Sequence, residues 1–454
     1  AQPLSGAEDV ATNNVVGTAI NDQTLSDKIL SNQIIGDRVI TLDVAAIIQG
    51  VANNAGVEVT RFRAKAAKFD YQASLRSAWA PSVSIGGRYS KRDDASSINL
   101  ADPFGAVVVS DDSSYVYEAK LTQPLFRPSQ QRYDTKAAAL RRDSSNLQSK
   151  ADLHRTEGLA LIEYIELLVL AEARASLLQL ETSLDSRLQR IQLNVLAGRT
   201  LKTDQLQVKV ALNRVRQQLV ENNSAQLNLK AALRLSLGLD RLITIQIDAT
   251  GLSSLGFFTD GLEQVNTALQ QQLSCYQRSD CQAIALDVSR SRVQAKSLKA
   301  SYLPKIDLSV TETRSNGLLF SPRSDRQTML EFSWPIFSGG QRLSKGKSIQ
   351  ALGDAQQSQL TAFQQNIQLQ ITQANSSISN AESQISLAKS SLNLDQERLR
   401  LSRSRYESGR LNIDQLLDAE ASLARSESDL AGAKLLRLRA ITTMRIATGE
   451  KYIR

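Results

Sequence analysis

The hydrophobic positions of this chain follow two different periods, which predict two kinds of element. Between about residues 82 and 92 apolar side chains alternate with polar ones, and the alternation returns at about 114–124, 305–314 and 327–335. A period of two is typical of a β-strand with one apolar face. Elsewhere apolar residues recur at spacings of three and four, which indicates amphipathic helices. The pattern therefore predicts four strands and several helices.

The longest helical patterns are unusually long. One runs from Ser129 to about Leu196, and a helix of that length would span about 100 Å at 1.5 Å per residue. Another begins after Gly339 and Gly340, and its apolar residues fit one heptad frame, which is typical of a coiled-coil seam. That frame contains Ile367, Ile371, Ala374, Ile378, Ala381, Ile385, Ala388, Leu392 and Leu399.

A short glycine-containing stretch ends each of these long patterns, and we interpret each stretch as the tip of a helical hairpin. The first tip spans residues 196–205 around Gly198, and the second spans residues 405–415 around Gly409. In both tips Gly-Arg is followed by Asp-Gln-Leu, at residues 204–206 and 414–416, with one extra intervening residue in the first. A return helix with its own apolar seam follows each tip. Two similar tips indicate an internal duplication.

Equal spacing of matching residues supports this duplication. Three pairs are separated by the same number of positions: Pro124 and Pro335, Gly198 and Gly409, and Gly238 and Gly449. Each repeat is expected to contain a helix, two strands, a long helix, a tip and a return helix. The expected divisions are an irregular N-terminal arm (1–40), a first repeat (41–238), a linker (239–261) and a second repeat (262–454).

Composition agrees with long helices more than with compact cores. The 454 residues include only 8 prolines, 22 glycines and 5% aromatic residues, and the mean hydropathy is −0.25. No run approaches the roughly 18 apolar residues of a membrane-spanning helix, so a membrane crossing would have to use strands. The net charge of +8 comes from Lys and Arg that alternate with acidic residues along helices. We interpret them as solvated faces and expect no nucleic-acid partner.

Few residues suggest covalent chemistry. Cys275 and Cys281 are close enough in sequence for a small disulfide loop in an oxidising compartment, and two reduced thiols in a surface loop are the alternative. A metal site is less favoured, because no His is near the two sulfurs. His154 lies mid-helix without a Cys or carboxylate cluster and is expected to be a surface or seam residue. We therefore expect no enzyme activity, no cofactor and no metal.

The predicted strands carry aromatic residues near their ends. Strands that face lipid, with aromatic anchors at the interface, would show this pattern, and an ordinary sheet packed on helices is the alternative. Four strands leave open edges and cannot enclose a lumen, which oligomerisation would close. The candidate anchors are Trp79, Tyr115, Tyr117, Tyr302, Phe332 and Trp334.

The order of these motifs, given twice between about residues 41 and 449, resembles the TolC family of outer-membrane export channels. The resemblance is carried by Tyr-Leu-Pro at 302–304, Trp-Pro-Ile-Phe-Ser-Gly-Gly at 334–340, Tyr406-x-x-Gly409 and Leu416-Leu417-Asp418-Ala419. It implies an α+β membrane protein, a trimer whose four strands per chain form one 12-stranded β-barrel continued by a long α-helical coiled-coil barrel. It also implies a location in the bacterial outer membrane, reaching into the periplasm, with the signal peptide removed.

The resemblance implies a gate at the tips. Tyr406 and Asp204 match a polar network that closes the tunnel in this family, and Asp418 matches an aspartate constriction. A second constriction position falls on Gln415, where this chain departs from the family.

Other tip residues match the family less closely. The position that matches the family's gating arginine is Leu411 in this chain, and Arg410 is next to it. Asp204 and Asp414 are also expected to cap the helices that follow each glycine turn, a role compatible with gating. Contacts with a partner protein are expected at Gly198, Gly409, Leu201 and Leu411.

These expectations describe an exit duct. It would passively conduct small molecules or proteins from an inner-membrane transporter and a periplasmic adaptor protein to the exterior of the cell. The resemblance implies that the duct is a homotrimer surrounded by outer-membrane lipid. Drug efflux and type I secretion are not distinguished, because the partner selects the cargo. The alternative function is a soluble coiled-coil periplasmic adaptor or scaffold without a pore.

Overall fold

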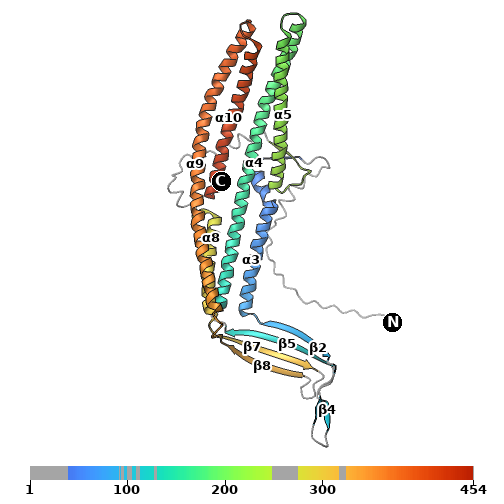
Figure 1. Cartoon of the computed structure of the whole chain (residues 1–454), viewed down its shortest axis with the longest axis vertical. Coiled ribbons are helices and arrows are strands. Elements are labelled where there is room, and N and C mark those ends of the chain that lie inside the picture. Colours follow the sequence, from blue (N-terminus) through green and yellow to red (C-terminus); the bar gives the residue numbers. More distant parts are fainter. Residues whose placement is uncertain are drawn as a thin grey trace, which may run out of the picture.

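The computed structural model describes residues 39–91, 93, 97–99, 105–108, 113–126, 130–247, 275–315 and 324–452. The chain forms two long helical hairpins that stand side by side on one small sheet (Figure 1). The first hairpin consists of α4 (Gln130–Leu196) and α5 (Lys202–Ser236), and the second of α9 (Gln341–Glu407) and α10 (Ile413–Thr448). The shorter helices α3 (Ala55–Trp79) and α8 (Ser279–Ala300) accompany the lower parts of the long ones.

All four expected strands are present and form one antiparallel sheet. They are β2 (Ser82–Lys91), β5 (Ser113–Phe126), β7 (Lys305–Ser315) and β8 (Ser324–Ser333), in the order β2-β5-β7-β8. The middle pair, β5 and β7, joins the two halves of the chain. Among the described residues, strands β2 and β8 each have one neighbour, so this sheet has two open edges.

The register of the sheet separates an apolar face from a polar one. Residues paired directly across antiparallel strands share a face, and Val83 pairs with Leu121, which pairs in turn with Val310. Leu308 pairs with Leu330, and Ile306 with Phe332, so the apolar face extends over all four strands. The opposite face carries polar residues, among them Ser84, Arg88, Glu118, Lys120, Ser309, Thr311, Gln327 and Glu331.

A small hairpin extends from the segment that the sequence indicates only as a polar loop. It consists of β3 (Ser97–Asn99) and β4 (Ala106–Val108), which pair antiparallel. Strands of three residues are too short to show a period, and this explains why the sequence pattern does not reveal them.

The region from residue 41 to 80 differs from the single helix that the pattern indicates. It contains the end of β1 (Val39–Leu42), α2 (Val44–Gly50), a short 3-10 helix, η1 (Val51–Asn53), and α3. The side chain of Asp43 accepts a hydrogen bond from the Ala46 amide at 2.6 Å, and the Asn54 side chain accepts one from the Gly56 amide at 2.8 Å. Each of these residues caps a helix start and so divides the segment.

Strand β1 also corrects the expected limit of the N-terminal arm at residue 40. Val39 and Ile40 belong to this strand, which pairs in parallel with β6 (Thr244–Ile247). The expected linker 239–261 therefore contains one short strand, as its isoleucines suggest. Residues 1–38 and 248–274 lie outside the described residues, together with the expected start of the second repeat.

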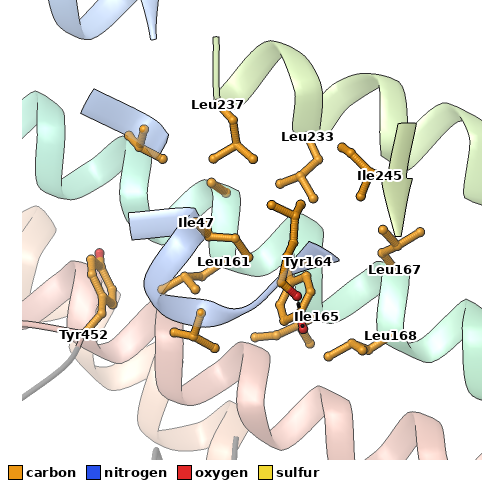
Figure 2. Close-up of a cluster of buried hydrophobic side chains, with 14 of the residues drawn as sticks. Ile47, Leu161, Tyr164, Ile165, Leu167, Leu168, Leu233, Leu237, Ile245 and Tyr452 are labelled. Atoms are coloured by element: carbon orange, nitrogen blue, oxygen red, sulfur yellow. Dashed lines mark hydrogen bonds between the residues drawn. The ribbon is translucent and has the colours of Figure 1, made fainter. Parts of the chain in front are cut away.

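The main hydrophobic core lies midway along the molecule, where β1, β6 and α2 wrap around α4 (Figure 2). Tyr164 of α4 is fully buried there, and its hydroxyl donates a hydrogen bond to the Leu42 carbonyl at 3.3 Å. Leu233 and Leu237 close the core from the end of α5. The hairpins thus project from a packed centre. None of the helices in the described part of the chain contains an apolar run long enough to span a bilayer.

Candidate functional site

The two tips of the hairpins have the same backbone geometry. At the first tip the amide of Gly198 donates to the Val195 carbonyl at 3.0 Å, and the amide of Arg199 to the Asn194 carbonyl at 2.8 Å. At the second tip the same two bonds join Gly409 to Tyr406 at 2.9 Å and Arg410 to Arg405 at 2.8 Å. This pair of bonds is the Schellman motif, and it requires the positive φ that both glycines adopt, +69° and +70°.

The helices after the tips begin earlier than expected. The N-cap of α5 is Leu201 and that of α10 is Asn412, and neither side chain makes a capping hydrogen bond. Asp204 and Asp414 lie inside the first turns of these helices, so the expectation that they are N-caps is wrong. Their carboxylates still lie near the positive end of the helix dipole, which favours them.

Tyr406 packs into a small apolar cluster next to the second tip. Its partners are Ile191 of α4, Val208 of α5 and Ile413 of α10, all three buried. Asp204 accepts a hydrogen bond from the neighbouring Thr203 hydroxyl at 3.4 Å. No hydrogen bond joins Tyr406 to Asp204 within the described residues, so the structure does not bring the expected network together, and their role stays a prediction.

A buried ion pair joins the two hairpins close to the tips. Arg187 of α4 donates from Nη2 to Oε1 of Glu420 on α10, and these side chains are only 10% and 4% exposed. The Arg187 guanidinium lies 6.0 Å from the centre of the Tyr406 ring, and Arg403 of α9 approaches the same Glu420 oxygen to 3.9 Å. Two arginines from different helices therefore approach one carboxylate, and the Tyr406 ring lies beside one of them.

Burial dominates the electrostatics of this pair. It raises the pKa of Glu420, and the nearby Arg187 and Arg403 oppose that effect. The second carboxylate oxygen, Oε2, and Arg187 Nε are buried without a hydrogen-bond partner among the described residues. The pair is thus incompletely satisfied. Removing Glu420 would leave Arg187 buried without a counter-charge, which typically costs about 3–5 kcal/mol, whereas removing Arg187 would leave Glu420 only the more distant and exposed Arg403.

The sequence contained a signal for this pair that our expectations did not use. Arg187 continues the spacing of three and four set by Leu180 and Leu184, and Ile191 follows it. Glu420 directly follows Ala419, which belongs to an apolar seam of α10. A charge at a seam position is costly unless it is paired, so each residue predicts a partner of opposite charge. The periodicity alone does not say which residue the partner is.

A second contact connects the tips directly. Gln207 of α5 donates to Oδ2 of Asp414 on α10 at 2.8 Å. Asp414 also lines a groove of about 940 Å³ between α4, α5 and α10, together with Asp418 and Asp429. Leucines of α4 form the opposite wall, namely Leu170, Leu177, Leu180 and Leu184. Asp418, Gln415 and Arg410 are exposed, and no side-chain hydrogen bond or ion pair joins them to another residue within the described chain, so their roles remain predictions.

The expected partner-contact residues differ between the tips. Leu201 of the first tip is 70% exposed, and Leu196 beside it is 85% exposed. Leu411 of the second tip is half-buried. Gly198 and Gly409 have nothing within 4 Å of the position that a Cβ would occupy. These glycines are therefore required by backbone conformation and not by lack of space.

The candidate lipid anchors lie at the two ends of the sheet. Tyr302, Phe332 and Trp334 lie at the end next to the helices, where the Trp334 indole donates to the Tyr302 carbonyl at 3.1 Å. Trp79, the last residue of α3, lies at the same end and is 69% exposed. Tyr115 and Tyr117 lie toward the other end, with their ring centres 5.4 Å apart.

The two cysteines and the histidine pack against neighbouring side chains. Cys275 and Cys281 form a disulfide, and Cys281 packs in a buried cluster with Ile367 and Met444, so the alternative of a surface loop with reduced thiols is not the arrangement found. His154 stacks on Tyr452 with ring centres 4.6 Å apart, and burial lowers its pKa. Within the described residues no cluster of three or more His, Cys, Asp or Glu side chains is arranged to hold a metal ion.

Comparisons with known proteins agree with this architecture. Residues 269–450 match the family model described as outer membrane efflux protein. No curated protein sequence matches the chain significantly. Solved structures share its fold over most of the chain, at 14–15% identity in the three cases described next.

CusC, studied for folding and transmembrane channel formation, matches with a TM-score of 0.74 and 15% identity over 92% of this chain and 95% of its own. The outer-membrane channel MtrE of Neisseria gonorrhoeae, solved in an open state, matches with a TM-score of 0.73 and 15% identity over 93% of this chain and 94% of its own. The outer-membrane channel CmeC of Campylobacter jejuni matches with a TM-score of 0.72 and 14% identity over 89% and 85%.

These matches confirm the resemblance seen in the sequence: residues 269–450 match the outer membrane efflux protein model, and the chain shares its fold with CusC, MtrE and CmeC.

Proposed function

We propose that this chain is one protomer of a trimeric outer-membrane exit duct, which passively conducts cargo delivered by an inner-membrane transporter and a periplasmic adaptor protein. The observation that carries the proposal is the four-stranded sheet. Its apolar face is exposed in the protomer, with Val83 at 70%, Ile85 at 83% and Phe332 at 61%. A soluble adaptor or scaffold would leave this face in water, whereas outer-membrane lipid would cover it.

The open edges of the sheet support the trimer. Unpaired edge strands are templates for further pairing, and β2 and β8 each lack one neighbour in the protomer. Pairing β8 of one copy with β2 of the next, three times, gives a closed barrel of 12 strands. Barrels of about eight strands fill their interior with side chains, so 12 strands leave room for a lumen.

The two faces of the sheet suit this arrangement. The polar face, with Arg88, Glu118, Lys120 and Glu331, would line a water-filled lumen. Aromatic residues occur at both ends of the apolar face, where membrane proteins place them at the lipid–water interfaces. Passive conduction needs no catalytic group, and we propose no enzyme activity.

We place the gate at the tips of the hairpins. The buried pair Arg187–Glu420 and the Gln207–Asp414 hydrogen bond hold the two hairpins of a protomer together there. Opening would be a change between two packings of the helices at the tips, and contacts with the adaptor would favour the open one. In the closed trimer, Asp418, with Gln415 near it, would form a constriction that favours cations. Tyr406, Asp204 and Arg410 would contribute to the lock.

Planar-bilayer recording of the purified protein tests this function. We expect a detergent-dependent trimer with small, discrete conductance, raised several-fold in an Arg187→Met variant, because Glu420 would keep only the exposed Arg403 of its own hairpin and the ion pair between the hairpins would be lost. Lys65→Met, at an exposed position of α3, removes a cation away from the tips and serves as control. Solubility without detergent, or no discrete conductance in any variant, would contradict the duct and favour the scaffold.

A further inference from the structure

A second groove, of about 610 Å³, lies between α8 and α9 close to the sheet. Its walls include the apolar residues Ala295 and Leu298 of α8 and Leu343 and Ile349 of α9. Gly346 leaves space at one wall, because a Cβ added there would contact the Leu298 side chain at 3.4 Å. The groove therefore combines an apolar lining with a defined shape.

Cations surround this groove. Arg292 and Lys299 come from α8, Arg342 and Lys347 from α9, and Asp354 is the one acidic residue among those that line it. No described carboxylate forms an ion pair with any of the four cations, although many other arginines of the chain are paired in this way. Four uncompensated cations around one hollow attract an anion.

One of these cations is already held in place. Arg342 Nη1 donates to the Pro335 carbonyl at 3.1 Å and to the Ser301 carbonyl at 3.3 Å, and its guanidinium lies 5.2 Å from the centre of the Tyr302 ring. Its remaining N–H groups stay available for other acceptors. A pre-oriented guanidinium binds phosphate oxygens well, because less rotamer entropy is lost on binding.

The position of the groove indicates where the anion comes from. Helix α8 ends at Ala300, and β7 begins at Lys305; β8 ends at Ser333, and α9 begins at Gln341. The groove thus lies immediately beyond the sheet, beside Tyr302 and close to Trp334, two of the candidate interface anchors. If the sheet crosses the membrane as proposed above, this is the level of the periplasmic headgroups.

We propose that the groove binds the phosphate-bearing headgroup of an anionic phospholipid in the periplasmic leaflet. This proposal rests on the proposed membrane position of the sheet. Basic pockets beside membrane-embedded segments bind anionic headgroups in this way. A second copy of the chain is a poorer occupant through α3, because that helix carries five cations against Glu58 and Asp70.

Native mass spectrometry of the detergent-solubilised trimer tests the proposal. Phosphatidylglycerol and phosphatidylcholine are titrated separately, and we expect the wild type to bind the first at least about tenfold more tightly. The variant Arg292→Gln/Lys299→Gln/Lys347→Gln should lose this preference. The control variant Arg63→Gln/Lys65→Gln/Lys68→Gln, which removes the same number of exposed cations from α3, should keep it.

Several outcomes would overturn the proposal. Equal binding of both lipids by the wild type, or an unchanged preference in the groove variant, would show that the groove does not select the headgroup. Complete displacement by inorganic phosphate in millimolar excess would identify a site for a free anion. Dissociation of the groove variant into monomers would identify an interface between copies. Conductance measured on the same wild-type preparation separates failure of this inference from failure of the proposed duct.

Discussion

The two hairpins end in the same turn but present different surfaces around it. Around the first tip Leu193, Leu196, Leu201 and Leu206 are all more than half exposed. Around the second tip the exposed residues are polar, among them Arg405, Glu407, Arg410 and Asn412. A Schellman turn constrains only the glycine and the backbone bonds around it. The duplication has therefore preserved the geometry of the tip while its surface chemistry diverged.

The seams of the hairpins differ as well. In the first hairpin Leu184, Leu212 and Val215 are buried between α4 and α5. In the second, the buried residues of α9 end at Ala381, well before the tip. Leu387, Leu394 and Leu401 then form an exposed stripe with heptad spacing. The second hairpin thus presents exposed apolar surface near its tip, which a neighbouring helix could cover.

The largest effect is expected from breaking the contact between the hairpins. Glu420→Ala leaves Arg187 buried without a counter-charge and should lower the free energy of unfolding by about 3–5 kcal/mol. The double variant Arg187→Met/Glu420→Leu removes both charges and should recover most of that loss. Urea unfolding of the purified protein, followed by circular dichroism, measures both. Equal losses in the single and double variants would show that the ion pair is not what holds the hairpins.

The glycine turns test whether the two tips are equivalent. Gly198→Ala and Gly409→Ala each force a residue with a Cβ into a positive φ and should cost about 1–2 kcal/mol. Because both sites are open and have the same hydrogen bonds, the two losses should agree within about 0.5 kcal/mol. Gly432→Ala, in the middle of α10, should stabilise slightly. A much larger loss at one tip would mean that its neighbours also restrict it.

The buried carboxylates provide a test of pH dependence. Burial raises the pKa of Glu157 on α4 to about 7. A carboxyl whose pKa is higher in the folded state destabilises the fold only when it is charged, so stability should fall as pH rises from about 4.5 through about 7. Because Glu157 is partly exposed, the change should be about 1 kcal/mol after screening.

The pH profile of Glu157→Gln gives the control for this prediction. Glutamine keeps the size of the side chain without the charge, so the variant should lack the decline over that range. Thermal unfolding midpoints of both proteins, measured at matched ionic strength, make the comparison. Parallel profiles would assign the pH dependence to other groups.

The smallest effect on stability is expected from the tip surfaces. Leu196→Ala/Leu201→Ala shortens exposed side chains only, without adding a capping group at the start of α5, and should alter the free energy of unfolding by less than about 0.5 kcal/mol. If the first tip binds the adaptor, this variant should nevertheless lose export of a fluorescent dye in cells of the native host. Arg410→Ser, at the second tip, is the matched comparison. Unimpaired export in the leucine variant would show that the apolar tip is not the surface that binds the adaptor.

Elements with a regular local period could be predicted from the sequence, and contacts between distant segments could not. The strands and the heptad seam of α9 follow from residues that repeat along the chain, as at Val83 and Ile85 or Ile367 and Ile371. The break before Ala55 was missed because Asn53 and Asn54 are two polar residues in an otherwise helical pattern. The partner of Arg187 lies more than 200 residues away, and no period connects it with Glu420.

Asn54 also joins the ends of two helices that are far apart in the sequence. Its side-chain oxygen accepts from the amides that start α3, while its side-chain nitrogen donates to the carbonyls of Leu235 and Ser236 at the end of α5, each at 3.1 Å. A carboxamide can serve both ends because it is donor and acceptor, whereas a carboxylate is an acceptor only. Asn54 therefore makes its full set of side-chain hydrogen bonds only when the end of α5, 181 and 182 residues further along the chain, lies against it. One side chain thus joins the start of the helix next to the sheet to the end of the helix that returns from the tip.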